Sequence, residues 1–175
     1  RTLSIGEAQM DYLKKAKLIQ RWGAGFDTVD LAAAGARGIQ VAVTVGMNAV
    51  PVAEMAVALT LAVYRNLVPL TNAVMAGSWP RETYSRRAYT ISGKTVGLYG
   101  GGRVGQKAAA LFRAFGARVL YYDPFRLPPE REHELSMIYV EQAALWPQVD
   151  ILSLHAPLTE ETRGIVGKRV LSRMK

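Results

Sequence analysis

Three glycines, Gly100, Gly102 and Gly105, stand in the spacing G-x-G-x-x-G between an apolar run at 95–99 and a helical pattern at 106–115. In such a loop the first glycine permits a tight turn. The second lets a phosphate approach the backbone, and the third lets the helix pack close to the strand. Free N–H groups and the helix dipole favour an anion at a helix N-terminus. The pattern therefore predicts a loop that binds the phosphates of a nucleotide.

A carboxylate follows where a dinucleotide site would need one. Asp123 ends the second apolar run, at 118–122, and comes about 20 residues after the glycines. An acid there can accept hydrogen bonds from a ribose hydroxyl. An isolated Asp before Pro124 is more commonly a turn residue. Because strand, glycine loop, helix, strand and acid occur in order, dinucleotide binding is the preferred interpretation.

Composition limits the remaining classes. The 175 residues, half of them apolar, suit one domain or two small ones. Without cysteine, neither a disulfide framework nor a thiolate metal site can form, and we expect a cytoplasmic protein. The net charge of +8 favours anionic ligands such as phosphates, but the basic residues are scattered, so no nucleic-acid partner is predicted. The apolar run between Glu54 and Arg65 is too short to span a bilayer, so no membrane partner is predicted either.

The first part of the chain alternates helical and strand patterns. Ser4 and Glu7 have capping-box spacing and predict a helix to about Ala16. A strand at 18–22, a helix at 29–36 and a strand at 40–43 follow. This order predicts a parallel sheet.

A long helix is predicted next, from Asn48 to about Asn66, with Pro69 ending or kinking it. Four apolar residues fall at helical spacing and favour a core-facing stripe: Val52, Ala56, Leu59 and Val63. A subunit interface is the alternative for such an apolar helix.

Beyond the helix, residues 76–93 form a polar connection that we expect to be an arm or loop. Past the dinucleotide unit, the charge-rich segment 127–134 is expected to be a solvated turn or short helix. The remaining pattern predicts strands and helices in alternation, at 137–140, 143–146, 150–154 and 168–174. The fold class is therefore α/β, with a Rossmann-type doubly wound parallel sheet, present in part.

Several short stretches, taken in order along the whole chain, resemble the D-isomer-specific 2-hydroxyacid dehydrogenases. This group includes 3-phosphoglycerate dehydrogenase and glyoxylate/hydroxypyruvate reductase. The stretches are 23–30, 52–54, 77–79, 93–97, 100–105, 122–124, 155–159 and 161–162. The resemblance implies a two-domain enzyme with NAD bound in the cleft. Residues 1–46 would be part of a flavodoxin-like substrate domain, and residues 47–175 part of the NAD-binding domain with the long interdomain helix.

The resemblance also assigns roles to residues. It implies that backbone N–H groups at Ala24 and Gly25 lie near the substrate carboxylate, and that Asp123 holds the adenine ribose. The residues expected to contact the rest of the cofactor are Gly100, Gly102, Arg103, Val104, Gly105, Ala156 and Pro157. In relatives the long helix helps to form a dimer, so a homodimer is expected.

Acid–base machinery is the part that this chain is expected to lack. In the family, a catalytic arginine, an acid and a histidine lie downstream of the position of Lys175, so we expect an interior piece of a longer enzyme that is inactive alone. Of the two histidines, His133 stands among charged residues and is expected to be solvated. His155 matches a cofactor-loop position and is a poor candidate for the acid. No catalytic residue and no metal ligand is assigned.

The predicted activity is hydride transfer between NAD(H) and a small D-2-hydroxy acid or 2-keto acid. The alternative is an NAD-sensing regulatory protein, like the co-repressors that resemble this family. A nucleic-acid binder driven by charge ranks third. Which hydroxy acid would be used stays open.

Overall fold

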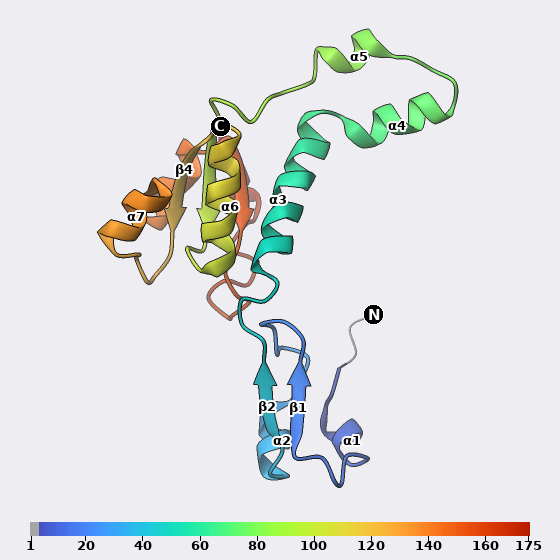
Figure 1. Ribbon diagram of the computed structural model, residues 1–175, viewed down its shortest axis with the longest axis vertical. Coiled ribbons are helices and arrows are strands. Elements are labelled where there is room, and N and C mark those ends of the chain that lie inside the picture. Colours follow the sequence, from blue (N-terminus) through green and yellow to red (C-terminus); the bar gives the residue numbers. More distant parts are fainter. Residues whose placement is uncertain (1–3) are drawn as a thin grey trace. The chain divides into compact units, whose positions relative to one another are not determined.

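The computed structural model describes residues 4–175. Contacts divide the chain into two compact units, one ending at Asn48 and the other spanning Ala49–Lys175. The division falls at the start of the long helix, two residues beyond the boundary expected at 46/47. Figure 1 shows the elements of both units in chain order.

The first unit is a small parallel α/β unit. Its elements are α1 (Glu7–Met10), β1 (Leu18–Arg21), α2 (Leu31–Ala36) and β2 (Gln40–Val43). The strands pair in parallel, with Leu18 opposite Gln40 and Arg21 opposite Val43. Helix α2 begins after Asp30, whose side chain accepts a hydrogen bond from Ala33 N at 2.9 Å. The buried core of this unit consists of Met10, Ile19, Val29, Ala33, Ala34 and Ile39.

Two expectations for this unit are wrong. The helix expected at 4–16 is one turn, α1, because Ile5 N donates to Thr28 O at 2.8 Å and keeps that segment extended. Ser4 does not cap the helix, since its hydroxyl donates to the same carbonyl. Gly6 precedes the helix instead, and its N–H donates to Gln9 Oε1 at 3.0 Å.

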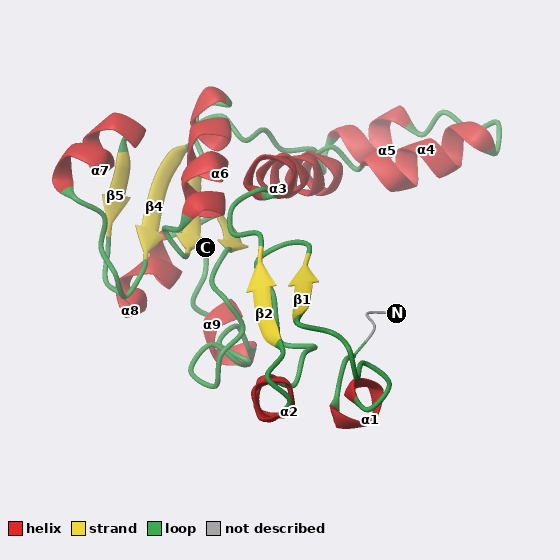
Figure 2. Cartoon of the chain, turned by 60° about the horizontal axis from the view of Figure 1, so that its bottom comes forward, coloured by secondary structure: helices red, strands yellow, loops and turns green. Residues whose placement is uncertain are grey.

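The second unit contains a four-stranded sheet in the order β5-β4-β3-β6 with every neighbouring pair parallel (Figure 2). Its strands are β3 (Thr95–Tyr99), β4 (Arg118–Tyr122), β5 (Met137–Tyr139) and β6 (Ile151–Leu154). Its helices are α3 (Ala49–Tyr64), α4 (Leu67–Met75), α5 (Arg81–Ser85), α6 (Arg103–Ala114), α7 (Pro129–Leu135), α8 (Gln142–Leu145) and α9 (Lys168–Leu171), with a 3-10 turn at Trp146–Gln148.

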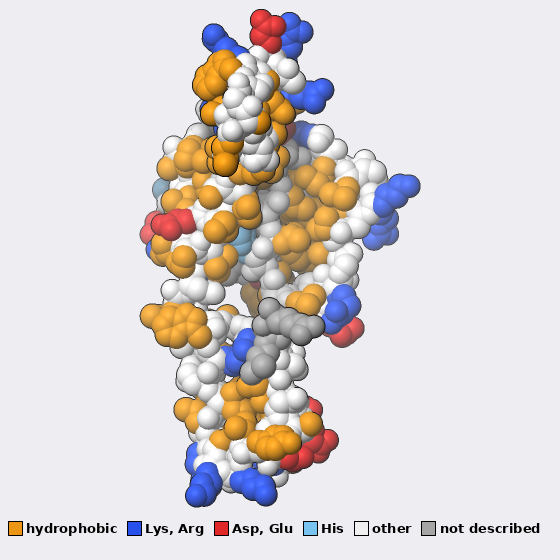
Figure 3. Space-filling view, turned by 90° about the vertical axis from the view of Figure 1, so that its right-hand side faces the viewer, with side chains coloured by type: hydrophobic (Ala, Val, Ile, Leu, Met, Phe, Trp, Pro, Cys, Tyr) orange, Lys and Arg blue, Asp and Glu red, His pale blue; other side chains and the backbone are white. Residues whose placement is uncertain are grey.

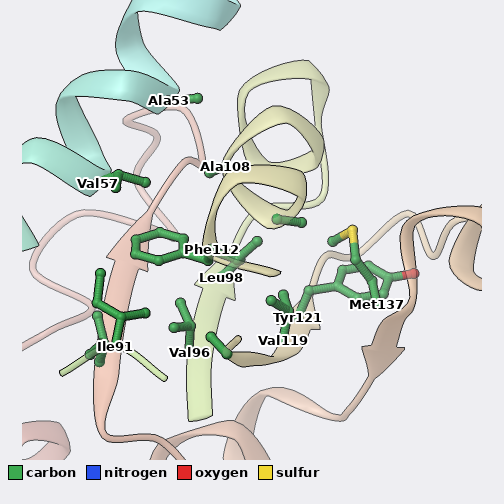
Figure 4. Close-up of a cluster of buried hydrophobic side chains, with 13 residues drawn as sticks. Ala53, Val57, Ile91, Val96, Leu98, Ala108, Phe112, Val119, Tyr121 and Met137 are labelled. Atoms are coloured by element: carbon green, nitrogen blue, oxygen red, sulfur yellow. The ribbon is translucent and has the colours of Figure 1, made fainter. Parts of the chain in front are cut away.

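Side chains of the central strands alternate between the two faces of the sheet and belong to two buried clusters. Val96 and Leu98 of β3 face a cluster that includes Phe112 of α6 (Figure 4). Tyr99 joins Leu145 in a second cluster on the other side. This alternation follows from the two-residue period of a strand. The sheet is therefore covered by helices on both faces, as a parallel sheet requires.

The face of α3 that was expected to be buried is exposed. Leu59 is 60% exposed and Val63 73% exposed, and the buried positions of α3 are Ala49, Ala53 and Val57. Apolar residues lie all around this helix, so their spacing alone could not select the face. The small side chain of Ala53, with none of its surface exposed, packs in the core cluster that contains α6 (Figure 4).

The connection after α3 is more helical than expected. Pro69 lies in the first turn of α4, where a missing N–H is tolerated. Residues 76–93 contain the short helix α5, so that segment is not only a loop. Of the helices described, none alone is long and apolar enough to cross a membrane. Together α3 and α4 are long and apolar enough, but the two helices are bent by 62° at the break between them.

Truncation of Phe112 tests the α6 core. Its ring is fully buried between α6 and the sheet, so Phe112→Ala should lower the free energy of unfolding by about 3–5 kcal/mol. The matched control is Phe125→Ala, because that ring is 85% exposed; its effect should stay within about 0.5 kcal/mol. Urea unfolding followed by circular dichroism measures both. Equal losses in the two variants would contradict the packing described.

Candidate functional site

The glycine loop leaves β3 at Gly100 in a conformation that few other residues adopt. Gly100 has φ of +114°, and its N–H donates to Tyr122 O at 2.8 Å. A methyl group there would lie 2.7 Å from the carbonyl carbon of His155. Both the left-handed backbone and the neighbouring chain after β6 therefore require glycine at this position.

Gly102 and Gly105 differ in what surrounds them. A side chain at Gly105 would collide with the carbonyl oxygen of Gly100, so helix α6 can lie this close to the loop only with glycine there. At Gly102, the residue before α6, a methyl group would have no other atom within 4 Å and would face open space. Among the described residues, no hydrogen bond uses the N–H of Gly102. The loop therefore has an open surface at the N-terminus of a three-turn helix.

Gly101 is held on both sides of its backbone, which sequence patterns did not reveal. Its N–H donates to Asp123 Oδ2 at 2.7 Å, and its carbonyl accepts from Gln106 Nε2 at 2.9 Å. A methyl group on Gly101 would lie 2.9 Å from the ring of Tyr121. Close packing therefore requires glycine at this position of the loop as well.

Gln106 connects the loop to α7. Its Oε1 accepts a hydrogen bond from Arg131 Nε at 2.9 Å, and Arg131 also pairs with Glu134. Both polar atoms of the Gln106 amide are therefore used. No spacing in the sequence links 106 to 131, because the contact depends on how α7 packs beside α6.

Asp123 lies at the carboxyl end of β4 beside the loop. Its Oδ1 accepts from Phe125 N at 2.8 Å, and its Oδ2 accepts from Gly101 N. Each carboxylate oxygen can accept a second hydrogen bond. Asp123 therefore combines the turn contact that is common for this residue type with a link to the glycine loop.

The chain after β6 borders the same loop. His155 N donates to Tyr99 O at 2.8 Å, and its ring Nε2 lies 2.9 Å from Ser153 Oγ. Burial lowers the pKa of His155 below its ordinary value of 6.5, so the imidazole is neutral at pH 7. Ala156 is half-buried and Pro157 is exposed, with the Pro157 carbonyl accepting from Thr162 Oγ1 at 2.7 Å.

The predicted substrate loop belongs to the first unit. Gly23, with φ of +106°, donates its N–H to Thr44 Oγ1 at 2.6 Å. Ala24 and Gly25 are exposed, and no hydrogen bond among residues 4–175 uses their N–H groups. Gly25 O accepts from Arg21 Nε at 3.4 Å. The loop thus presents two backbone donors to solvent.

The second unit fits a dinucleotide. One loop system contains the open surface at Gly102, the N-terminus of α6 and the carboxylate of Asp123. N–H groups at a helix N-terminus can bind an anion, and a carboxylate in this position can accept hydrogen bonds from a ribose. Within the described part of the chain, no group of three or more His, Cys, Asp or Glu side chains could hold a metal ion.

Comparison with known proteins agrees with this geometry. A sequence profile described as "D-isomer specific 2-hydroxyacid dehydrogenase, NAD binding domain" matches residues 57–175. A chloroplastic/mitochondrial formate dehydrogenase of Arabidopsis thaliana is 38% identical over 93% of this chain and 42% of its own length. A glyoxylate reductase of Thermococcus litoralis is 35% identical over 99% of this chain and 54% of its own length.

Solved structures are similar throughout. A formate dehydrogenase of Granulicella superposes with a TM-score of 0.90 at 32% identity, covering 98% of this chain and 46% of that one. An NAD-dependent formate dehydrogenase of Staphylococcus aureus, solved in complex with NAD, has a TM-score of 0.85 at 34% identity over 98% of this chain and 51% of that one. The chain therefore spans about half the length of the relatives that it matches.

A side chain at Gly102 tests whether the pyrophosphate lies on this loop. Gly102→Val fills the open surface, so NAD affinity should fall by about 10- to 100-fold, as expected for lost hydrogen bonds to a charged group. The fold should survive, because a methyl group at this position would have no atom within 4 Å other than those of its chain neighbours. Isothermal titration with NAD measures the effect. Gly167→Val, at the start of α9, is the control and should bind NAD normally. Unchanged NAD affinity in Gly102→Val would exclude this loop.

Proposed function

Because this chain belongs to the D-isomer specific 2-hydroxyacid dehydrogenase family, we propose that it serves hydride transfer between NAD(H) and a small D-2-hydroxy acid or 2-keto acid. The observation that carries the proposal is the glycine loop, with Gly102 open to a ligand and Asp123 bonded to Gly101. In this arrangement one rigid loop can recognise both a pyrophosphate and a ribose.

The predicted cofactor residues have proposed roles, and those of Gly100 and Gly105 are to allow the tight loop and the close approach of α6. Gly102 and the N-terminal residues of α6, Arg103 and Val104, bind the pyrophosphate, and Asp123 binds the adenine ribose. Ala156 and Pro157 line the cofactor site beyond β6. Support comes from their common position at the carboxyl ends of β3, β4 and β6, where open α/β sheets bind ligands.

The first unit is proposed to be part of a flavodoxin-like substrate domain, and the second part of a Rossmann domain. The N–H groups of Ala24 and Gly25 are exposed and suit a substrate carboxylate. Backbone N–H groups in a turn can bind an anion through hydrogen bonds alone, without a charged side chain. This unit contains a parallel pair of strands flanked by short helices, which supports the assignment.

Acid–base catalysis needs a proton donor with a pKa near neutrality and a cation for the carboxylate. His155 is a poor proton donor, because burial lowers its pKa. Its ring is also hydrogen-bonded to Ser153 and not to a carboxylate. We therefore assign no catalytic residue to this chain and expect it to bind NAD without useful turnover. A cytoplasmic location, and the absence of nucleic-acid and membrane partners, stay predictions.

Parallel assays of binding and turnover test this function. The 175-residue chain and the longest natural form of the protein are titrated with NADH. Both are then assayed by NADH absorbance with glyoxylate, hydroxypyruvate and phosphohydroxypyruvate, and with NAD and formate. The chain should bind NADH and show no turnover, whereas the longest form should reduce at least one keto acid. Oxidation of formate instead would show that its substrate is the one named for the formate dehydrogenases among its relatives.

Two other outcomes would overturn parts of the proposal. Turnover by the 175-residue chain that disappears in His155→Ala would make His155 the acid. NAD binding by the longest form with silence toward every substrate would favour an NAD-sensing regulatory protein on the same fold.

A homodimer is proposed from the apolar surface of α3 and α4. Leu59, Val63, Leu67 and Met75 are each more than half exposed, and hydrophobic side chains gather on the face shown in Figure 3. Exposed apolar patches of this kind mark interaction sites. A second copy is the proposed occupant, because the family resemblance places a dimer contact on the long helix.

Charge substitution tests the dimer. Leu67→Asp should convert the protein to a monomer in sedimentation velocity, because a carboxylate would be buried without a partner. Phe125→Asp, at a position 85% exposed in the turn after β4, is the matched control and should leave the mass unchanged. A monomeric wild type at micromolar concentration, or a dimeric Leu67→Asp variant, would contradict the proposal.

A further inference from the structure

Behind Asp123, one arginine is held in a closed side-chain network. Arg126 Nε lies 2.8 Å from Glu132 Oε1, and Nη2 lies 2.9 Å from Oε2, so the guanidinium and the carboxylate form a two-bond pair. The Arg126 guanidinium carbon also lies 4.9 Å from the ring centroid of Tyr139. Both the edge and the face of the guanidinium are thereby in use.

Glu132 is itself held in place by the core. Tyr121 is fully buried. Its hydroxyl donates a hydrogen bond to Glu132 Oε1 at 2.7 Å and accepts one from Leu127 N at 2.9 Å. The Glu132 side chain is 12% exposed, compared with 57% for Arg126. The carboxylate is therefore the fixed member of the pair, and the arginine is the member that is more exposed to solvent.

The charges of this network are stable near neutral pH. Arg126 lowers the pKa of the Glu132 carboxyl, so Glu132 stays ionised. Burial, reinforced by the hydrogen bond to Glu132, raises the pKa of Tyr121 to about 12, so its hydroxyl keeps its proton. Arg126 and Glu132 thus form a pair with no net charge.

The position of Arg126 gives this pair a functional meaning. It lies in the same turn as Asp123, between β4 and α7, and that turn is folded by the bond from Phe125 N to Asp123. In dinucleotide-binding folds, an arginine near the ribose acid accommodates the 2′-phosphate of NADP. In the turn at 124–128, between Asp123 and α7, Arg126 is the one cation, and its side chain is 57% exposed. Arg126 is therefore placed to serve a 2′-phosphate.

We propose that Glu132 is a cofactor-selectivity residue, which excludes NADP by holding Arg126 away from a 2′-phosphate. Asp123 repels that phosphate directly, and Glu132 withholds the cation that would compensate. The proposal rests on the proposed contact between Asp123 and the adenine ribose. Glu132 does not touch the cofactor, and its role is to position Arg126.

Substitution of Glu132 in two backgrounds tests this role. Glu132→Gln keeps the shape and an acceptor for Tyr121 but removes the charge that holds Arg126. Affinities for NAD, NADP, 5′-AMP and adenosine 2′,5′-bisphosphate are measured by titration calorimetry at one salt concentration, in the wild type and in Asp123→Ser. In Asp123→Ser, adding Glu132→Gln should tighten both 2′-phosphorylated ligands by about tenfold, the value of one charge-assisted hydrogen bond. Affinities for NAD and 5′-AMP should not change.

Arg126→Met shows whether the gain depends on the arginine. Combined with Asp123→Ser and Glu132→Gln, it should abolish the gain. In the wild-type background it should leave NADP affinity unchanged, because Arg126 is held by Glu132. Glu134→Gln is the matched control, since it removes a carboxylate from the same helix that pairs with Arg131 and not with Arg126. It should give no gain that depends on Arg126.

The contrary outcomes separate this inference from the proposed function. A gain that survives Arg126→Met, or an equal gain in Glu134→Gln, would reflect only lost negative charge and would overturn the inference. Reduced NADP affinity in the single variant Arg126→Met would also overturn the inference, because it would show that Arg126 already contacts the 2′-phosphate. If Asp123→Ser improves NADP binding and Glu132→Gln adds nothing, the inference is wrong and the proposed function stands. If the wild type binds neither cofactor, both fail. Thermal unfolding confirms that each variant is folded.

Discussion

The close approach of α6 to the end of β3 is the constraint on which the second unit depends. Gly105 has its Cα against the carbonyl of Gly100, and no side chain fits between them. This contact brings the N-terminus of α6 to the loop and sets how closely the helix lies on the sheet. Small residues also allow close packing in the next layer, since Ala108 of α6 and Ala53 of α3 have no exposed surface. Helix α3 can therefore pack in the same cluster as α6.

Polar contacts then hold the loop in one conformation. The N–H of Gly101 donates a hydrogen bond to Asp123, and its carbonyl accepts one from Gln106. One consequence is that the acid proposed for the ribose and the loop proposed for the pyrophosphate are joined by a direct hydrogen bond. Two recognition points fixed to each other need little rearrangement when a rigid ligand binds, and a preformed site loses less conformational entropy.

Helix α7 contributes to this site although its segment was expected to be solvated. Exposed residues such as His133 fit that expectation. Glu132 does not, because it lies under Arg126 and against the hydroxyl of Tyr121. A charged side chain can be nearly buried when its partners satisfy it, and composition alone does not reveal such partners. The same helix thus combines a solvated surface with a contact that determines where a cation lies.

The sequence by itself determined the elements whose signals are local. The spacing of Gly100, Gly102 and Gly105 and the apolar runs at β3 and β4 predicted strand, loop and helix, because turn geometry and strand burial depend on neighbouring residues. Motifs matched in order along the chain were enough to identify the family. Tertiary structure decided which face of α3 is buried, since apolar residues surround that helix. It also decided that Ile5 pairs with Val29, with its N–H bonded to Thr28 O, instead of lying in a helix. The hydrogen bond from Arg131 to Gln106 likewise forms only when α7 packs beside α6, because residues 25 positions apart in sequence meet only through packing.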